Sequence, residues 1–352
     1  MADDRLSADE AYGLACQGTG LLWRGDYQNA RQLLSALGSR ADRRVEKRRK
    51  PGKSSPALSP AEEFHAYRQA RSQRARTLNS LLVPLAEDYA IPLRRAPNVR
   101  KACEQVYGAA EGPSVAPLRA LLGVIGAYEW RVKGIEIPEV GGRIHPHYGV
   151  FSPVRNEYVH LVSAAALPEA CAQTSTAFDI GTGTGVLAAV LARRGIQQVV
   201  ATDQDARALA CARENLERLG LASQVSVVEA DLFPPGRAAL VVCNPPWLPG
   251  RASSAIERGI YDHDSRMLRG FLKALPAHLE PQGEGWLILS DLAEHVGLRT
   301  RPELLAAIDE AGLKVLDRSD VRPTHPRASD PDDPLHAARA AEVTSLWRLA
   351  PQ

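Results

Sequence analysis

The 352-residue chain has few cysteines, no long apolar run and almost no net charge. Its five cysteines are Cys16, Cys103, Cys171, Cys211 and Cys243, and no two of them form a C-x-x-C pair. This spacing indicates neither a zinc site nor a disulfide framework. No apolar run approaches the roughly 20 residues of a membrane span, and the polar start MADDRLSADE is unlike a secretory signal. We therefore expect a cytoplasmic protein with no membrane partner.

The net charge of +2 does not by itself indicate a nucleic-acid or membrane partner. The hydrophobic fraction of 45% and the charged fraction of 24% are typical of a soluble globular protein. The charge is unevenly distributed, however. Residues 1–140 carry 22 Lys and Arg against 16 Asp and Glu, a balance of +6, whereas the rest carries 21 against 25, a balance of −4.

The first part of the chain, residues 1–135, is predicted to be a mainly helical domain. Its apolar residues recur at spacings of three and four, with polar residues between them, as in LSADEAYGLACQGTGLLWRGDYQNARQLLSAL. Residues 39–60 are basic and then rich in Pro and Ser, which is typical of an exposed loop or linker. This loop is either a solvated connection or a contact for phosphate or acidic protein.

From about residue 176 the pattern alternates between strands and helices. The expected strands are AFDIG, QVVATD, VSVVEADLF, ALVVCN, EGWLILS, LKVLDRSDV and AEVTSLWRLA, with helical segments such as RMLRGFLKALPAHL between them. This alternation predicts a largely parallel α/β sheet with helices on both faces, so residues 136–352 form a second domain. Ligands of such sheets bind beyond the carboxyl ends of the strands.

A glycine-rich turn follows the first of these strands. The sequence DIGTGTG puts Asp179 before Gly181, Gly183 and Gly185, and such a turn lets backbone approach a ligand closely. The next strand ends in Asp203, 22 residues after Gly181, about where a carboxylate meets ribose hydroxyls.

Two further features bear on the cofactor. The third strand ends in Asp231, which can accept a hydrogen bond from an adenine amino group. A dinucleotide dehydrogenase is the rival reading, but its G-x-G-x-x-G fingerprint has the third glycine one residue later.

Residues 176–290 resemble a class I S-adenosylmethionine-dependent methyltransferase, because FDIGTGTG, ATDQD, EADLF and NPPW follow in the order and spacing of that family. The resemblance implies a Rossmann-like, seven-stranded sheet with an antiparallel last strand, and S-adenosyl-L-methionine as cofactor. It implies cofactor-binding roles for Asp179, Gly181, Thr182, Gly183 and Gly185 at the methionine part, Asp203 at the ribose, Asp231 and Leu232 at the adenine, and Asn244 beside them.

The tetrapeptide NPPW, residues 244–247, resembles the signature of methyltransferases that act on planar NH2 groups. Prolines cannot continue a central strand, so the strand before them ends near Asn244. The Asn244 side-chain oxygen and the Pro245 carbonyl can accept the two NH2 hydrogens and orient the nitrogen lone pair. Trp247 offers a flat face for stacking a planar acceptor. We predict Asn244, Pro245 and Trp247 as the catalytic residues.

The acceptor is less closely defined than the reaction. Residues 149–162, GVFSPVRNEYVHLV, resemble the segment before the glycine-rich turn in release-factor glutamine methyltransferases, with Glu157 at the acidic position. GVFSP also resembles small-domain methyltransferases that modify guanine N2 in ribosomal RNA. We expect a protein glutamine amide, in a release factor or ribosomal protein, with ribosomal RNA guanine N2 or adenine N6 as the alternative. A non-catalytic binding module is the third possibility.

Two regions have predicted roles outside the cofactor site. The positive balance of residues 1–135 and their separation from the cofactor motifs predict that they recognise the macromolecular acceptor. Residues 321–343 form a long connection between the last two strands and are expected to fold over the acceptor site. His325 and His336 flank acidic residues there, but their spacing matches no metal motif, so no metal is expected.

Overall fold

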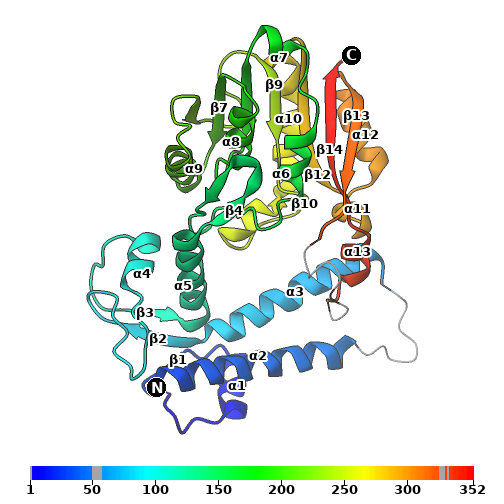
Figure 1. The fold of residues 1–352 in the computed structure, drawn as a ribbon. Coiled ribbons are helices and arrows are strands. Elements are labelled where there is room, and N and C mark those ends of the chain that lie inside the picture. Colours follow the sequence, from blue (N-terminus) through cyan, green and yellow to red (C-terminus); the bar gives the residue numbers. More distant parts are fainter. Residues whose placement is uncertain (1, 50–57, 325–329, 331–332) are drawn as a thin grey trace. The chain divides into compact units, whose positions relative to one another are not determined.

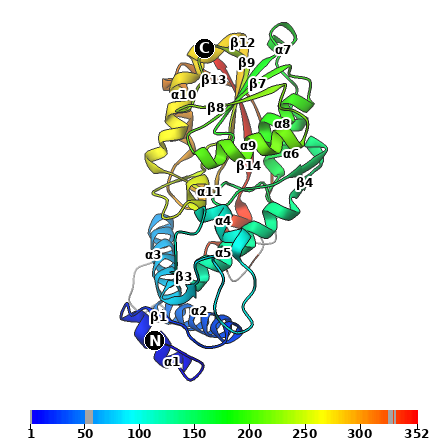
Figure 2. The ribbon, with the colours of Figure 1, turned by 90° about the vertical axis from the view of Figure 1, so that its left-hand side faces the viewer.

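The structure is a computed structural model that describes residues 2–49, 58–324, 330 and 333–352. The chain divides into two units, Met1–Glu129 and Trp130–Gln352. Their elements are labelled in Figure 1, and Figure 2 gives a second view at 90°.

The N-terminal unit combines helices with a small three-stranded sheet. Its helices are α1 (Ala8–Cys16), α2 (Tyr27–Arg49), α3 (Pro60–Asn79), α4 (Arg100–Tyr107) and α5 (Leu118–Lys133), and its strands are β1 (Leu21–Leu22), β2 (Leu81–Leu85) and β3 (Ser114–Pro117). The central strand β2 is parallel to β1 and antiparallel to β3. Large buried side chains, among them Trp23, Tyr27 and Leu37, form its core. The mainly helical prediction is confirmed, but the sheet was not predicted.

Helix α3 ends at Asn79, and the segment LLVPL after it forms β2, because Val83 and Pro84 favour an extended chain. One local prediction for this unit is wrong. The loop predicted over residues 39–60 is largely displaced by helix: α2 continues to Arg49 because Ala, Arg, Glu and Lys are good helix formers. Ser59 starts α3 with a capping box, and residues 50–57 lie outside the described residues.

The C-terminal unit contains the predicted seven-stranded sheet. The strands are β6 (Thr176–Ile180), β7 (Gln198–Asp203), β8 (Val225–Glu229), β9 (Ala238–Cys243), β12 (Leu279–Ser290), β13 (Leu313–Val321) and β14 (Thr344–Pro351). Their spatial order is β13-β14-β12-β9-β6-β7-β8. Among these described strands, β14 alone runs opposite to the others, so it is antiparallel to both of its neighbours, β13 and β12. The predicted fold class, including the antiparallel last strand, is therefore confirmed.

Both faces of the central strands of this sheet are buried, whereas the edge strands β8 and β13 are largely exposed. Alternate strand residues pack into two cores, one with Ala177, Leu240 and Ile288 and the other with Phe178 and Val241. The first core is covered by helices α6 (Glu157–Ala164), α8 (Val186–Arg193) and α9 (Ala206–Arg218), and the second by α10 (Arg266–His278) and α12 (Arg301–Glu310). Figure 2 shows α10 on one side of the strands and α6, α8 and α9 on the other. The near-continuous apolar strands follow from this double burial.

Shorter elements complete the unit. They are β4 (Ile135–Ile137), β5 (Gly142–Ile144), α7 (Ala170–Gln173), β10 (Leu248–Pro249), β11 (Tyr261–Asp262), α11 (Leu292–His295), α13 (His336–Ala341) and the 3-10 turns η1 (Pro138–Val140), η2 (Ile256–Gly259) and η3 (His263–Ser265). The connection between β13 and β14 includes α13. Residues 325–329 and 331–332, and with them His325, lie outside the described residues.

Candidate active site

Asp179 fastens the glycine-rich turn to the helix that follows it. Its Oδ2 accepts hydrogen bonds from the Thr182 hydroxyl at 2.7 Å and from the Ala188 backbone N–H at 3.0 Å, in the first turn of α8. The side chain is buried, and burial raises the pKa of the Asp179 carboxyl to about 6, although both hydrogen bonds lower it. Asp179 therefore holds the backbone of the turn in place through these two hydrogen bonds.

All three glycines of the turn adopt the left-handed region that other residues rarely occupy: Gly181 has φ +72°, Gly183 has φ +56° and Gly185 has φ +80°. A Cβ at Gly185 would lie 3.2 Å from the Ala212 backbone of α9, so helix and turn pack closely there. A Cβ at Gly183 would meet only Val150, at 4.0 Å. The chain at Gly183 thus leaves space that a ligand can enter.

Asp203, at the end of β7, lies beside this turn. Its Oδ2 accepts from the Gly183 N–H at 3.0 Å, and its Oδ1 accepts from the Asp205 N–H at 3.0 Å. Burial raises the pKa of Asp203, opposed by the backbone hydrogen bonds. The carboxylate is partly exposed and joins the ends of β6 and β7.

Asp231 and Leu232 follow β8 and join the same edge. The Asp231 carboxylate is exposed, accepts from Gln204 at 2.7 Å and forms a 2.6 Å ion pair with Arg266. Leu232 has φ +74°, and its carbonyl accepts from the Thr202 hydroxyl at 2.6 Å. The ends of β6, β7 and β8 are therefore linked through one hydrogen-bond network, because the Thr202 carbonyl also accepts from the Thr182 N–H at 2.8 Å.

The NPPW segment follows β9, which pairs with β6. Asn244 is partly exposed, Pro245 is buried, and Trp247 packs against both cores of the unit. The Trp247 indole N–H donates to Asn244 Oδ1 at 2.8 Å. Within the described chain no donor reaches the Pro245 carbonyl. The segment therefore presents two carbonyl oxygens, one of which already has one partner.

The chain after NPPW returns to the glycine-rich turn. Strand β10 pairs with β11, and buried Asp262 of β11 accepts from the backbone N–H groups of Met267 and Leu268, at 3.0 Å each. These bonds cap the start of α10. A Cβ at Gly181 would collide with the Met267 side chain, so α10 lies against the turn.

Several residues of this edge were not predicted from the sequence. Thr202 and Gln204 flank Asp203 and could have been found by their place at the strand end. The hydrogen bond within NPPW follows from the three-residue spacing between Asn244 and Trp247. No local pattern indicates Arg266 or Met267, because they enter the site from a distant helix.

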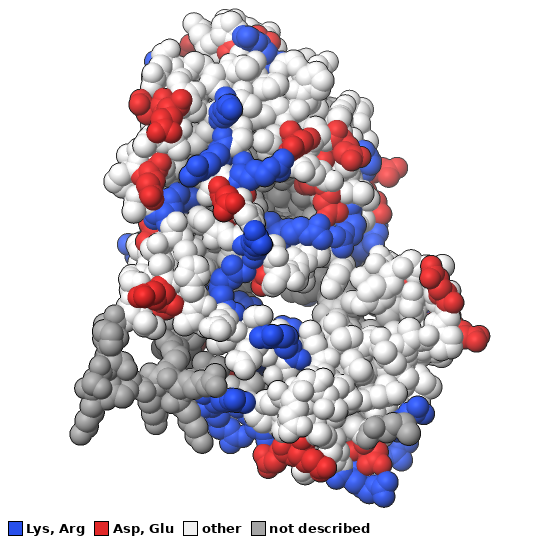
Figure 3. All heavy atoms as spheres, turned by 180° about the vertical axis from the view of Figure 1, so that it is seen from behind, with Lys and Arg blue, Asp and Glu red and all other residues white. Residues whose placement is uncertain are grey.

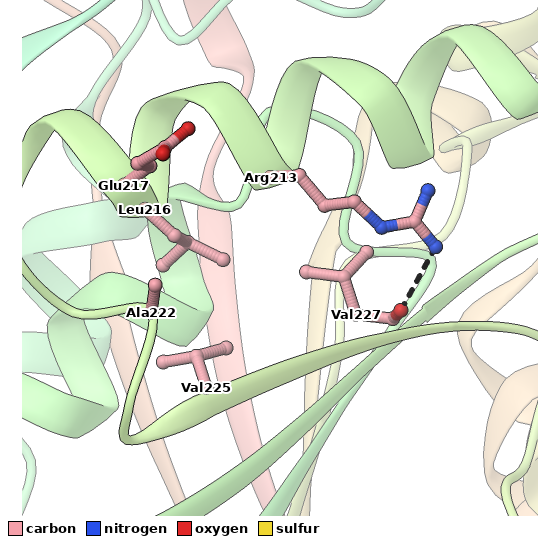
Figure 4. Close-up of a pocket in the computed structure, with 6 residues that line it drawn as sticks. All are labelled: Arg213, Leu216, Glu217, Ala222, Val225 and Val227. Carbon is pink, nitrogen blue, oxygen red and sulfur yellow. Dashed lines mark hydrogen bonds between the residues drawn. The ribbon is translucent and has the colours of Figure 1, made fainter.

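A separate pocket of about 200 Å³ lies between α9 and β8. Figure 4 shows its lining residues Arg213, Leu216, Glu217, Ala222, Val225 and Val227, with Arg213 donating to the Val227 carbonyl at 3.0 Å. None of the predicted site residues lines this pocket. It therefore plays no part in the candidate active site.

Charges near the strand ends are paired rather than of one sign. Asp205 forms ion pairs with Arg207 at 3.3 Å and with Arg258 at 3.5 Å. Figure 3 likewise shows Lys and Arg interspersed with Asp and Glu on one face of the molecule.

Among the described residues, no three or more His, Cys, Asp or Glu are arranged to hold a metal. No helix among the described residues is long and apolar enough to cross a bilayer.

Comparisons with known proteins give the site its context. A family model described as "Methyltransferase small domain" matches residues 141–295. Over 71 residues the chain is 49% identical to the ribosomal protein L11 methyltransferase of Pelotomaculum thermopropionicum, covering 20% of this chain and 23% of that protein.

Two further relatives differ in their named acceptors. The release factor glutamine methyltransferase of Cereibacter sphaeroides is 34% identical over 163 residues, 42% of this chain and 55% of that protein. The ribosomal RNA small subunit methyltransferase C of Alcanivorax borkumensis is 35% identical over 117 residues, 31% of this chain and 30% of that protein. The chain thus spans between 23% and 55% of the length of these three relatives.

Proposed function

We propose that the chain is an S-adenosyl-L-methionine-dependent methyltransferase acting on a planar NH2 nitrogen, because a model of the methyltransferase small-domain family matches residues 141–295. Its acceptor is a glutamine side-chain amide of a protein, such as a release factor or a ribosomal protein. The observation that supports this most directly is the pair of carbonyl oxygens of Asn244 and Pro245, beside the strand end that carries the glycine-rich turn.

The residues at the strand ends fit the cofactor in their chemistry. Gly183 leaves space beside the turn, and the partly exposed Asp203 carboxylate suits two ribose hydroxyls. Asp231 and the backbone at Leu232 suit an adenine amino group and ring edge. When bound, the cofactor supplies an electrophilic methyl group on a sulfonium. Asp179 keeps the turn in shape through Thr182 and Ala188.

Asn244 and Pro245 orient the acceptor nitrogen. An amide nitrogen is a poor nucleophile because its lone pair is delocalised into the carbonyl. A carbonyl oxygen can accept two hydrogen bonds, so Asn244 Oδ1 keeps one accepting position beside the Trp247 indole. The Pro245 carbonyl provides the second acceptor. Together they would hold the NH2 hydrogens, orient the nitrogen lone pair for the methyl group that the cofactor would supply, and stabilise the charge that develops on nitrogen.

Ribosomal RNA is the second candidate acceptor. The exocyclic amines of guanine N2 and adenine N6 are also planar NH2 groups, and the same two carbonyl oxygens suit them. This class is favoured by residues 149–153, GVFSP, and by the similarity to a ribosomal RNA methyltransferase over 117 residues. The third reading, a binding module without catalysis, predicts cofactor binding and no transfer.

The N-terminal unit supplies acceptor recognition in this proposal. Residues 1–140 carry the excess of Lys and Arg, a balance of +6. In α3 the exposed or partly exposed cations Arg71, Arg74 and Arg76 contrast with Glu62 and Glu63 at its start. Such a surface suits an acidic protein segment or the RNA around an acceptor.

One assay separates these possibilities. The purified chain is incubated with methyl-labelled S-adenosylmethionine and, in parallel, with intact ribosomes, protein-free ribosomal RNA, ribosomal proteins and release factors. If protease treatment releases the label from the macromolecular fraction, the glutamine acceptor is supported. If ribonuclease treatment releases it, the RNA alternative is supported. Cofactor binding without label in any fraction would support the binding module and contradict the proposed enzyme.

A further inference from the structure

We propose that Arg155 and Glu342 are positioning residues that fix the Trp247 indole and, through it, the Asn244 amide oxygen. This inference rests on the proposed function, because it concerns how the acceptor oxygens are held. It assigns a role to two residues outside the NPPW motif. Successive contacts connect the buried Glu342 carboxylate, through Arg155 and Trp247, to the Asn244 amide.

Glu342 is the anchor of this chain of contacts. Its side chain is 1% exposed, and its Oε1 accepts from the Ser290 hydroxyl at 2.7 Å and lies 3.2 Å from Arg155 Nη2. A buried carboxylate is costly unless it is paired and hydrogen-bonded. The Arg155 guanidinium cannot leave this position without leaving that charge unpaired.

Arg155 lies over the Trp247 ring. Its Cζ is 5.8 Å from the ring centroid, within the range in which a guanidinium is attracted to an indole face. A planar guanidinium combines such stacking with a fixed ion-pair geometry, which a Lys ammonium cannot do. The ion pair with Glu342 therefore limits how far the Trp247 ring can turn.

Trp247 transmits this constraint to Asn244. The indole N–H is only a donor, so its 2.8 Å hydrogen bond selects the oxygen of the Asn244 amide over the nitrogen. The bond holds Oδ1 at the site and keeps the amide from flipping. Phe at position 247 has no such donor, so this role belongs to the indole and is additional to stacking.

The anchor belongs to the long connection between β13 and β14. Glu342 caps α13, and its neighbour Val343 exchanges hydrogen bonds with Asp291: the Val343 N–H donates to Asp291 Oδ1 at 2.7 Å, and the Asp291 N–H donates to the Val343 carbonyl at 3.0 Å. At its other end the Thr324 N–H donates to Glu157 Oε1 at 2.9 Å. The connection is thus tied to the residue after β12 and to the start of α6.

The test follows the Trp247 indole directly in the full-length chain labelled with ¹⁵N-tryptophan. Its five Trp residues give five indole resonances, and Trp247→Phe identifies that of Trp247. The variants are Arg155→Met, Arg155→Lys and Glu342→Gln. Arg318→Met is the matched control, because Arg318 lies over Trp347 with its Cζ 5.2 Å from that ring, on strand β13 and outside the site.

The expected result is a shift of the Trp247 resonance in Arg155→Met and Glu342→Gln, with partial recovery in Arg155→Lys. Misplacement of the Asn244 oxygen lowers kcat by about 10- to 100-fold in Arg155→Met, while the cofactor Kd stays unchanged. Arg318→Met leaves the Trp247 resonance and kcat as in the parent. If Arg155→Met does not fold, the inference is tested with Arg155→Lys and Glu342→Gln instead.

Two outcomes overturn the inference: an unmoved Trp247 resonance in a folded Arg155 or Glu342 variant, or a moved resonance with an unchanged kcat. Failure of the proposed function is a different result, namely a parent chain that methylates no acceptor. In that case the resonance comparison alone decides: movement supports the Arg155 contact with Trp247, and its absence overturns it.

Discussion

The glycine-rich turn and the NPPW segment follow paired strands, β6 and β9, but they are held in different ways. The turn is fixed by bonds to Thr182, Ala188 and Asp203, all within about twenty-five residues of Asp179. In the arrangement proposed above, Trp247 of NPPW is held by Arg155 and the pair it makes with Glu342, each about ninety residues from Trp247. The hydrogen bonds that shape the glycine-rich turn are therefore local in sequence, whereas the proposed acceptor half depends on contacts between distant segments.

The largest expected effect comes from deleting the N-terminal unit, which tests whether acceptor recognition can be separated from cofactor binding. A fragment that begins at Trp130, where the two units divide, should bind S-adenosylmethionine and lose methyl transfer to the macromolecular acceptor. The reason is that the deleted unit contributes recognition, while the cofactor motifs lie in the retained unit. Calorimetry and the transfer assay check the two parts. Full transfer by the fragment would show that the N-terminal unit is only a structural cap.

Asn244→Ala should have the next largest effect. It removes one acceptor from the NH2 group and leaves the turn intact, and losing one preorganised partner costs about 10²–10³ in rate, or about 3–4 kcal/mol. Single-turnover rates at saturating cofactor measure this loss. Asn244→Asp keeps an acceptor and should retain more activity.

Thermal melts of the same variants are the control. If Asn244 were only a turn residue, Ala would lower the melting temperature and leave the rate intact. That pattern would refute the proposed role of the amide oxygen.

Asp179→Asn should change how stability depends on pH. The folded pKa of about 6 lies above the ordinary value of 3.8, so the stabilising contribution of Asp179 is full below pH 3.8 and is lost as the pH rises through about 6. Asn keeps an acceptor for Thr182 and Ala188 but does not titrate. The parent should therefore lose about 3 kcal/mol relative to the variant over this range. Denaturant titrations of the parent and of Asp179→Asn between pH 3.8 and about 6 measure this difference in the free energy of unfolding. A difference that does not change with pH would contradict a buried carboxyl that titrates in this range.

Asp203→Ala should have the smallest effect of these changes and act on the cofactor half alone. Removing a charged hydrogen-bond acceptor should weaken S-adenosylmethionine binding by about 1.5–3 kcal/mol. Glu229→Ala is a suitable control, because Glu229 is an exposed carboxylate at the end of the neighbouring strand β8. Calorimetry that finds equal cofactor affinity in both folded variants would remove Asp203 from the site.

The sequence predicted the large sheet well because its central strands, such as β6 and β9, are buried on both faces. Runs such as AALVVC in β9 leave no polar position, and the glycine-rich turn follows β6 directly. The small N-terminal sheet could not be predicted in the same way. Strand β1 is only Leu21–Leu22, and LLVPL of β2 continues an apolar spacing that also suits a helix.

The residues of the candidate site likewise differ in whether the sequence alone predicts them. Asp179, Asp203 and Asn244 could be predicted because each lies at or next to the end of an apolar strand. Arg155 lies in the segment 149–162 that the sequence singled out, but its contacts with Trp247 and Glu342 could not be predicted, because only the fold brings these residues together. Side chains that act through tertiary contacts leave no local pattern.

The central claim is that this chain methylates a planar NH2 nitrogen, and the chemical identity of the methylated atom tests it most directly. The labelled acceptor is digested to single amino acids and nucleosides, and the labelled product is identified by mass spectrometry against standards. We expect N5-methylglutamine, or N2-methylguanosine or N6-methyladenosine if the acceptor is RNA. Methyl groups on a carboxylate oxygen, a ring carbon, a thiol or a lysine amine would contradict it.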